Sequence, residues 1–421
     1  MTSDPRSDVI NRQYEAWSYP EPITDIPGWL EGNWERFDPS HAHPILWPDR
    51  GYQSGMDILI AGCGTNQAAV FAYTNPDAKV VGVDISQASL DHQQFLKDKY
   101  GLDNLELHLL PIEELPALGR EFDLVVSTGV LMVMADPQAG MNALAKCVRP
   151  DGVVATMVYA KYGRFAVTLL QSAFRDLGLG LDDESVRVVR AAMTQLAPDH
   201  PIRSYLHIAP DLQTDAGLVD TFLIGRESTY SADECIELTE RAGLVFQTWL
   251  MNAPYYPHAH LAPNEFSIAV GALPPAKQWS VMDRFRAANG CHFVVACRPG
   301  RPKESYAISF STPDALSYVP VFRHRCGLEG VEIYRPDWRV ALTPEGAELV
   351  RRVNGVLSIR EILEQSAGDG EEHPVQTEDG ALKFFEGLWQ YDFLAMTCTP
   401  SARDERRKPK VNGSGKRRPR R

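Results

Sequence analysis

The stretch from residue 57 to residue 86 constrains the fold of this chain more than any other. An apolar run at 57–61 ends in Gly62 and Gly64, and a second apolar run at 80–83 ends in Asp84. This order predicts a strand–helix–strand unit of a parallel sheet, in which the first apolar run is closed by glycines, a helical segment follows, and the second apolar run is closed by a carboxylate. The two glycines let the backbone turn sharply and approach a ligand with no Cβ in the way.

The spacing within this unit is typical of nucleoside binding. Asp84, at the carboxyl end of the second strand, is placed to accept hydrogen bonds from two ribose hydroxyls. A dinucleotide fingerprint also needs a third glycine three residues after the second, and that position is Gln67. NAD-linked redox chemistry is therefore disfavoured. The alternative for the whole stretch is an ordinary tight turn of a parallel sheet, with Asp84 capping the helix that begins near Ser86.

The run Ala61–Thr65 (Ala-Gly-Cys-Gly-Thr) resembles the first motif of class I S-adenosylmethionine-dependent methyltransferases. Further matches are the loop Pro111–Leu115, the strand Phe122–Ser127 and the turn Val148–Gly152. The resemblance covers residues 56–159 closely. It implies an α/β, Rossmann-like fold with a seven-stranded sheet, completed by strands at 244–250 and 291–297, and S-adenosylmethionine as the cofactor.

The resemblance also assigns cofactor contacts. Glycines at the first turn admit the methionyl part, Asp84 takes the ribose hydroxyls, and Ile85 stacks on adenine. The loop after the third strand reads the adenine edge, and the end of the fourth strand faces the methionine tail. The implied cofactor-binding residues are Ala61, Gly62, Gly64, Asp84, Ile85, Ile112, Glu113, Ser127 and Thr128. Catalytic residues stay unknown, because in-line methyl transfer needs positioning and a dry pocket rather than a catalytic triad.

Three positions depart from the family pattern. Ile60 stands where many relatives have a carboxylate, so we expect backbone carbonyls such as that of Ala61 to bind the methionyl amine. Asn66 replaces a third glycine, and we expect it to tolerate positive φ. Pro111 replaces an acid, which leaves Glu113 as the substitute. The run at 127–130 lacks an Asn/Asp-Pro-Pro-Tyr motif, which disfavours planar amides and exocyclic base amines as acceptors.

Composition and breaks in pattern divide the chain into segments. Residues 1–50 are rich in aromatics and predict a lid of short helices, or else packing on the sheet. Residues 51–298 form the methyltransferase domain, with a helical insertion at about 163–229 that covers the acceptor pocket or serves as a structural cap. Residues 299–304 are a linker, and 305–400 a small helical module that resembles winged-helix and PqqD-like domains. The basic tail at 401–421 is predicted to be disordered.

Charge and cysteine content limit which partners and which cellular compartment we expect for this chain. The net charge is −13, although the tail holds ten Lys or Arg against two acids. The acidic body disfavours nucleic acid, which only the tail could contact. The longest apolar runs fall short of a membrane span, and no signal-peptide core is visible. Seven scattered cysteines suit reduced thiols, so we expect a cytoplasmic protein.

Two functional hypotheses remain. In the first, the chain methylates an unidentified small molecule, peptide or protein. In the second, it is a non-catalytic scaffold or peptide-binding protein that acts through its C-terminal module. The histidine pairs 41/43 and 258/260 lack acidic or cysteine partners nearby in the sequence, so no metal site is predicted.

Overall fold

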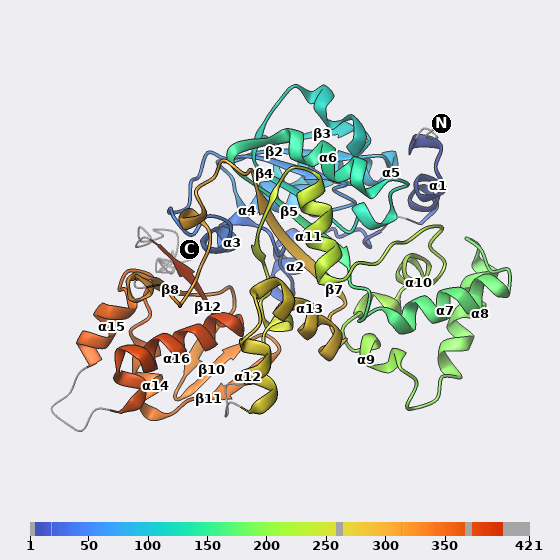
Figure 1. Ribbon diagram of the computed structural model, residues 1–421. Coiled ribbons are helices and arrows are strands. Elements are labelled where there is room, and N and C mark those ends of the chain that lie inside the picture. Colours follow the sequence, from blue (N-terminus) through green and yellow to red (C-terminus); the bar gives the residue numbers. More distant parts are fainter. Residues whose placement is uncertain (1–4, 18, 258–263, 313, 367–372, 399–421) are drawn as a thin grey trace, which may run out of the picture.

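The computed structural model describes residues 5–17, 19–257, 264–312, 314–366 and 373–398 (Figure 1). The basic tail and the histidine pair at 258 and 260 lie outside these ranges. No helix in the described ranges is both long and apolar enough to cross a bilayer.

A seven-stranded sheet with the order β3-β2-β1-β4-β5-β7-β6 forms the centre of the fold. Strands β1 to β5 run parallel, and β7 pairs antiparallel with both β5 and β6. The strands are β1 (Asp57–Ala61), β2 (Lys79–Asp84), β3 (Leu105–Leu109), β4 (Phe122–Thr128), β5 (Val148–Tyr159), β6 (Val245–Trp249) and β7 (Cys291–Cys297). The predicted Rossmann-like architecture is confirmed.

Helices cover both faces of the sheet because alternate strand residues are apolar on each side. Ile58 and Ile60 pack with residues of α3, α4 and α5, whereas Leu59 and Ala61 pack with residues of α6 and α11. The helices of these layers are α3 (Pro39–Leu46), α4 (Gln67–Thr74), α5 (Gln87–Tyr100), α6 (Pro137–Cys147), α11 (Ala232–Arg241) and α13 (Pro275–Arg286). A capping box starts α11, where Ser231 and Glu234 each bond the other's backbone N–H.

Two helical regions precede and interrupt this core. The N-terminal segment forms α1 (Val9–Ala16) and α2 (Ile26–Gly32) before α3, so the predicted short helices are confirmed. The insertion forms α7 (Phe165–Asp176), α8 (Asp183–Thr194), α9 (Ile202–Leu206) and α10 (Asp215–Phe222) around its own hydrophobic cluster. Figure 1 shows the insertion (green) and the C-terminal module (orange to red) on opposite flanks of the sheet.

The C-terminal module contains short strands as well as the predicted helices. Its helices are α14 (Pro344–Arg351), α15 (Ile359–Ser366) and α16 (Glu378–Gln390). Two small sheets accompany them, made by β8 (Val319–Phe322) with β12 (Leu394–Thr397) and by β9 (Gly327–Glu329), β10 (Glu332–Arg335) and β11 (Trp338–Ala341). These elements share one hydrophobic cluster made entirely of module residues.

The module is also tied firmly to the sheet domain. The side chain of Asp392 is 1% exposed, and its oxygens accept hydrogen bonds from the backbone N–H groups of Asn252 (2.8 Å) and Ala253 (2.9 Å). The predicted linker at 299–304 is held in place as well, because Arg301 is buried and donates to Leu46 O (3.2 Å) and to Asp49 (3.1 Å). The composition of this segment gave no sign of that buried arginine.

Candidate functional site

The turn after β1 takes the conformation that its glycines permit. Gly62 and Gly64 have φ of +76° and +53°. A Cβ added at Gly62 would lie 2.3 Å from a methyl carbon of Val130, so this position also lacks room for a side chain. The expectation of positive φ at Asn66 was wrong, because Asn66 is the N-cap residue of α4 and its φ is −142°. The left-handed conformations are confined to the two glycines before it.

The carboxylate of Asp84 lies beside this turn at the end of β2. Its Oδ2 accepts a hydrogen bond from Gly64 N (2.8 Å), and its Oδ1 accepts one from Ser86 N (2.9 Å). Burial raises the pKa of Asp84, and the backbone N–H groups of Ser86 and Gly64 oppose the rise. A carboxylate oxygen has two lone pairs, so each oxygen keeps one for a further donor. The structure thus brings together Gly64 and Asp84, two residues assigned from sequence.

The end of β4 lies next to the same turn, because Ile60 of β1 pairs with Val126 of β4. Ser127 is fully buried, and its Oγ has no hydrogen-bond partner in the described part of the chain. Thr128 is partly exposed and accepts a hydrogen bond from Gln67 Nε2 (3.1 Å). A buried hydroxyl with no protein partner suits a site that receives a polar ligand group.

The predicted adenine loop follows β3 as a 3₁₀ helix, Ile112–Leu118. Ile112 is 5% exposed and packs in the core with Ala61, so its backbone rather than its side chain is available to a ligand. Glu113 and Ile85 are partly exposed. The neighbouring Glu114 forms two hydrogen bonds with Arg6, at 2.8 and 2.7 Å, and so ties the loop to the N-terminal segment.

The N-terminal segment crosses the strand ends. The carbonyl of Pro20 accepts a hydrogen bond from Thr65 Oγ1 (2.8 Å), and a Cβ added at Gly64 would meet Pro20 Cδ at 3.1 Å. Asp8 pairs with Arg226 (3.0 Å), near the end of the insertion. The segment therefore bridges the glycine turn and the insertion.

A cluster of tyrosines and aspartates forms where this segment meets the insertion and the end of β5. Tyr14 and Tyr159 donate to opposite oxygens of Asp220 (3.0 and 3.3 Å), and Tyr19 donates to Asp211 (2.9 Å). The tyrosines are partly exposed, whereas Asp220 is buried. We call these five residues the tyrosine–aspartate cluster.

Burial sets the protonation of this cluster. It raises the pKa of Asp220 to about 6 and raises the pKa of Tyr14 and Tyr159 well above the ordinary value for tyrosine. Near neutral pH, Asp220 is therefore mostly ionised while both phenols keep their protons. A carboxylate that accepts from two phenols can take up a proton through either hydroxyl.

A buried ion pair lies against the cluster. Arg164 and Glu227 are 0% and 4% exposed and lie 2.7 Å apart. The Arg164 guanidinium stacks 3.6 Å from the ring centroid of Tyr159 and donates to Tyr205. None of these roles was predicted from the sequence, because the cluster and the ion pair come from separate segments with no shared motif. The two N-terminal tyrosines looked like ordinary packing aromatics.

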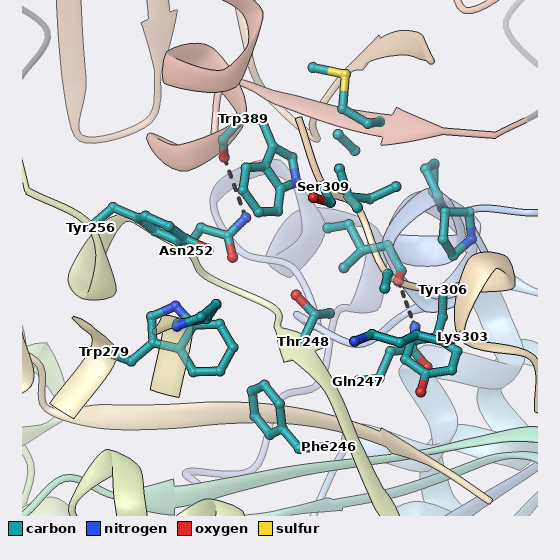
Figure 2. Close-up of a pocket in the computed structure, with 18 of the residues that line it drawn as sticks. Phe246, Gln247, Thr248, Asn252, Tyr256, Trp279, Lys303, Tyr306, Ser309 and Trp389 are labelled. Atoms are coloured by element: carbon teal, nitrogen blue, oxygen red, sulfur yellow. Dashed lines mark hydrogen bonds between the residues drawn. The ribbon is translucent and has the colours of Figure 1, made fainter. Parts of the chain in front are cut away.

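A cavity of about 540 Å³ lies elsewhere, between β6 and the C-terminal module. In Figure 2, Phe246 and Thr248 of β6 lie along one side and Trp389 along the other, with Tyr256 and Trp279 at one end and Lys303 and Tyr306 at the opposite end. No strand in the described ranges pairs with the outer side of β6. We call this cavity the β6 groove. The unpaired edge of a sheet strand thus faces a hollow lined by aromatic rings.

The histidine pair near the N-terminus is used for packing. His41 stacks on His324 of the module, with ring centroids 4.3 Å apart, and its burial lowers its pKa to about 4. Within the described ranges, no group of three or more His, Cys, Asp or Glu is arranged to hold a metal ion.

Comparisons with known proteins agree with this geometry. The methyltransferase-domain family profile matches residues 52–175, which include Gly62, Gly64 and Asp84 but neither Tyr14 nor Asp220. An uncharacterized protein of Synechococcus sp. is 30% identical over 399 residues, covering 87% of this chain and 90% of that protein. The malonyl-[acyl-carrier protein] O-methyltransferase of Acetivibrio thermocellus is 28% identical over 127 residues, only 42% of its own length.

Among solved structures, PKMT2 from Rickettsia typhi in complex with AdoHcy superposes with a TM-score of 0.62 at 15% identity. The superposition covers 87% of this chain and 76% of that one. Coverage of 87% cannot be contained in residues 1–298, so it extends into the C-terminal module. The shared fold therefore includes more than the methyltransferase sheet.

Proposed function

Because this chain belongs to the class I S-adenosylmethionine-dependent methyltransferases, we propose that it binds S-adenosylmethionine at the ends of β1, β2 and β4 and methylates an acceptor beside the tyrosine–aspartate cluster. The observation that carries the proposal is the Asp84 carboxylate. Two backbone N–H groups hold it beside the glycine turn, and one lone pair per oxygen is left for ribose hydroxyls. The partnerless hydroxyl of Ser127 nearby is a second polar group that suits the cofactor.

The proposed contacts follow the strand ends in order. Ala61, Gly62 and Gly64 would hold the methionyl part through the backbone. Asp84 would bind the ribose, Ile85 would stack on the adenine ring, and Ile112 and Glu113 would read its edge. Ser127 and Thr128 would face the methionine tail. When bound, S-adenosylmethionine supplies a methyl group activated by a sulfonium.

The other requirements of methyl transfer concern the acceptor. The protein must orient the acceptor, exclude water and receive the proton that an amine or hydroxyl acceptor loses. We assign that proton to the tyrosine–aspartate cluster. Tyr14 or Tyr159 can accept it at its hydroxyl oxygen while passing its own proton to Asp220, at 3.0 and 3.3 Å respectively. The lid formed by residues 5–25 would shield this step from solvent.

Calorimetry with S-adenosylhomocysteine tests the cofactor assignment. Asp84→Ala removes charge-assisted contacts to the ribose and should cost about 1.5–3 kcal/mol, or roughly 10- to 150-fold in affinity. Asp103→Ala, an exposed carboxylate beyond the end of α5, is the matched control and should bind normally. Equal affinity in both variants would refute the assignment. Cofactor binding with no methyl transfer to any extract of the source organism would favour the scaffold alternative.

We further propose that the β6 groove binds an extended peptide of a protein acceptor. The unpaired edge of β6 offers backbone donors and acceptors to an added strand. The rings of Tyr256, Trp279 and Trp389 provide apolar contact for a side chain of that peptide. The module would in this way recruit the acceptor to the methyltransferase domain.

Labelled S-adenosylmethionine and cell extract test the groove. Trp279→Ala should reduce transfer of label into protein several-fold while S-adenosylhomocysteine affinity stays normal. Phe285→Ala is the matched control, because this residue lies on the same helix α13 and is 63% exposed. If the label enters only small molecules, or if Trp279→Ala transfers it to protein as well as the control does, the recruitment proposal fails.

A further inference from the structure

The end of β1 offers no charge to a cationic ligand group. Ile60 is fully buried and apolar, and its side chain packs with the core of α3, α4 and α5. S-adenosylmethionine carries an ammonium group on its amino-acid part, and a buried ammonium without an anionic or strongly accepting partner is costly. Backbone carbonyls such as that of Ala61, which we expect to bind this ammonium group, would offset only part of the cost of burying it.

A carboxylate from the N-terminal segment lies beside the same strand ends. Glu35 follows α2, and its Oε2 accepts a hydrogen bond from Gln67 Nε2 at 2.7 Å. The same amide nitrogen lies 3.1 Å from Thr128 Oγ1 at the end of β4. Gln67 is the first residue of α4, three positions after Gly64. Glu35 is thus fixed between the glycine turn and the end of β4.

The charge of Glu35 is not balanced by an ion pair. No Lys, Arg or His within the described ranges forms a salt bridge with it, and the side chain is partly exposed rather than sealed. Burial and the nearby Asp38 raise the pKa of Glu35 to about 7, while Gln67 and Arg36 oppose the rise. A cation placed against this carboxylate would hold it ionised.

We propose that Glu35 binds the ammonium group of the cofactor's amino-acid part, in place of the carboxylate that β1 lacks. This inference rests on the proposed function of the site. Glu35 lies between α2 and α3, in the same N-terminal segment that crosses the glycine turn at Pro20. The amino-acid part of the cofactor is then fully bound only when this segment lies against the strand ends.

Two ligands that differ in their amino-acid part test the proposal by calorimetry. S-adenosylhomocysteine carries the ammonium group, and 5′-methylthioadenosine lacks the amino acid but keeps the ribose and adenine. Glu35→Gln should lower affinity for the first about tenfold or more and leave affinity for the second unchanged. Glu31→Gln, an exposed carboxylate on α2, is the control and should change neither. Asp84→Ala should weaken both ligands.

The pH dependence gives an independent readout. An ionised Glu35 is the binding form, so wild-type affinity for S-adenosylhomocysteine should fall by up to about tenfold per pH unit below 7, and Glu35→Gln should remove this dependence. If Glu35→Gln leaves affinity unchanged, weakens both ligands equally or lowers only turnover, the assignment is overturned while Asp84 still supports the proposed function. If the wild type binds neither ligand, both proposals fail.

Discussion

The candidate site has two halves. We call the glycine turn with Asp84 the cofactor half and the tyrosine–aspartate cluster the acceptor half, and the two are built from residues separated by very different lengths of chain. Gly64 and Asp84 are 20 residues apart, and the bond between them involves a backbone N–H. Tyr14 and Asp220 are 206 residues apart, and Tyr159 reaches the same carboxylate across 61 residues. One half is therefore made by the local course of the backbone, and the other by side chains that meet only after the whole domain has folded.

This difference explains which parts were visible in the sequence. A glycine turn between two strands has a fixed spacing, so its residues and the following carboxylate could be assigned by position. A side-chain cluster assembled from the N-terminal segment, β5 and the insertion has no spacing to recognise. The acceptor half should also be the part whose substitutions change transfer without changing cofactor affinity, and the three predictions below test that separation.

The largest effect is expected at the buried ion pair of Arg164 and Glu227, which lies against Tyr159 of the acceptor half. Arg164→Leu leaves the Glu227 carboxylate, 4% exposed, without its partner. Breaking a buried pair on one side costs about 3–5 kcal/mol, because the remaining charge is uncompensated. Denaturant unfolding should show this loss of stability. S-adenosylhomocysteine affinity, measured well below the new melting temperature, should stay close to that of the wild type.

The control for this change is an exposed pair in the same insertion. Arg190 and Asp215 are 48% and 56% exposed, so Arg190→Leu should cost no more than about 1 kcal/mol. A loss at Arg164 no larger than at Arg190 would contradict the structural role of the buried pair. Loss of cofactor affinity along with stability would mean that the two halves form one cooperative unit.

A second, somewhat smaller effect concerns the proton. Asp220→Asn keeps the size of the side chain but removes the proton acceptor, so transfer should fall about 100-fold with cofactor affinity retained. In the wild type we expect the ionised form of Asp220 to be the active one. The rate should therefore be full above the pKa of about 6 and decline as the pH falls through it. Asp220→Asn should lose this limb of the profile.

Asp215→Asn provides the matched comparison, since Asp215 is an exposed carboxylate at the start of the same helix α10. Its rate and pH profile should match those of the wild type. A rate for Asp220→Asn within a few-fold of that for Asp215→Asn would remove the cluster from the proposed chemistry and leave it as a hydrogen-bonded support for the N-terminal segment.

The same contrast between local and long-range order holds for the fold. The strand Cys291–Cys297 has the predicted limits, and the helix after Asp84 begins at Gln87, close to the predicted start, because each follows from an uninterrupted local pattern. The strands β9 to β11 were missed, since they are short and carry Glu329, Glu332 and Arg339 on a largely exposed sheet. Glu35 belongs to no motif, and only the folded chain brings it to Thr128.

The smallest effect is expected where the C-terminal module holds the N-terminal segment. Arg325 donates to the carbonyls of Leu30 (2.7 Å), Glu31 (2.8 Å) and Gly32 (3.1 Å), the last turn of α2, and so stabilises the segment that leads into Glu35. These bonds are partly exposed, and the rest of the segment has its own contacts. Arg325→Ala should therefore weaken S-adenosylhomocysteine binding only a few-fold and leave 5′-methylthioadenosine binding unchanged. Arg339→Ala, an arginine of the same module that is 55% exposed and pairs with Glu329 and Glu332, should alter neither. Equal affinities in the two arginine variants would show that the module and the cofactor half are independent. A loss of affinity for S-adenosylhomocysteine alone would show that the C-terminal module supports the cofactor half of the site.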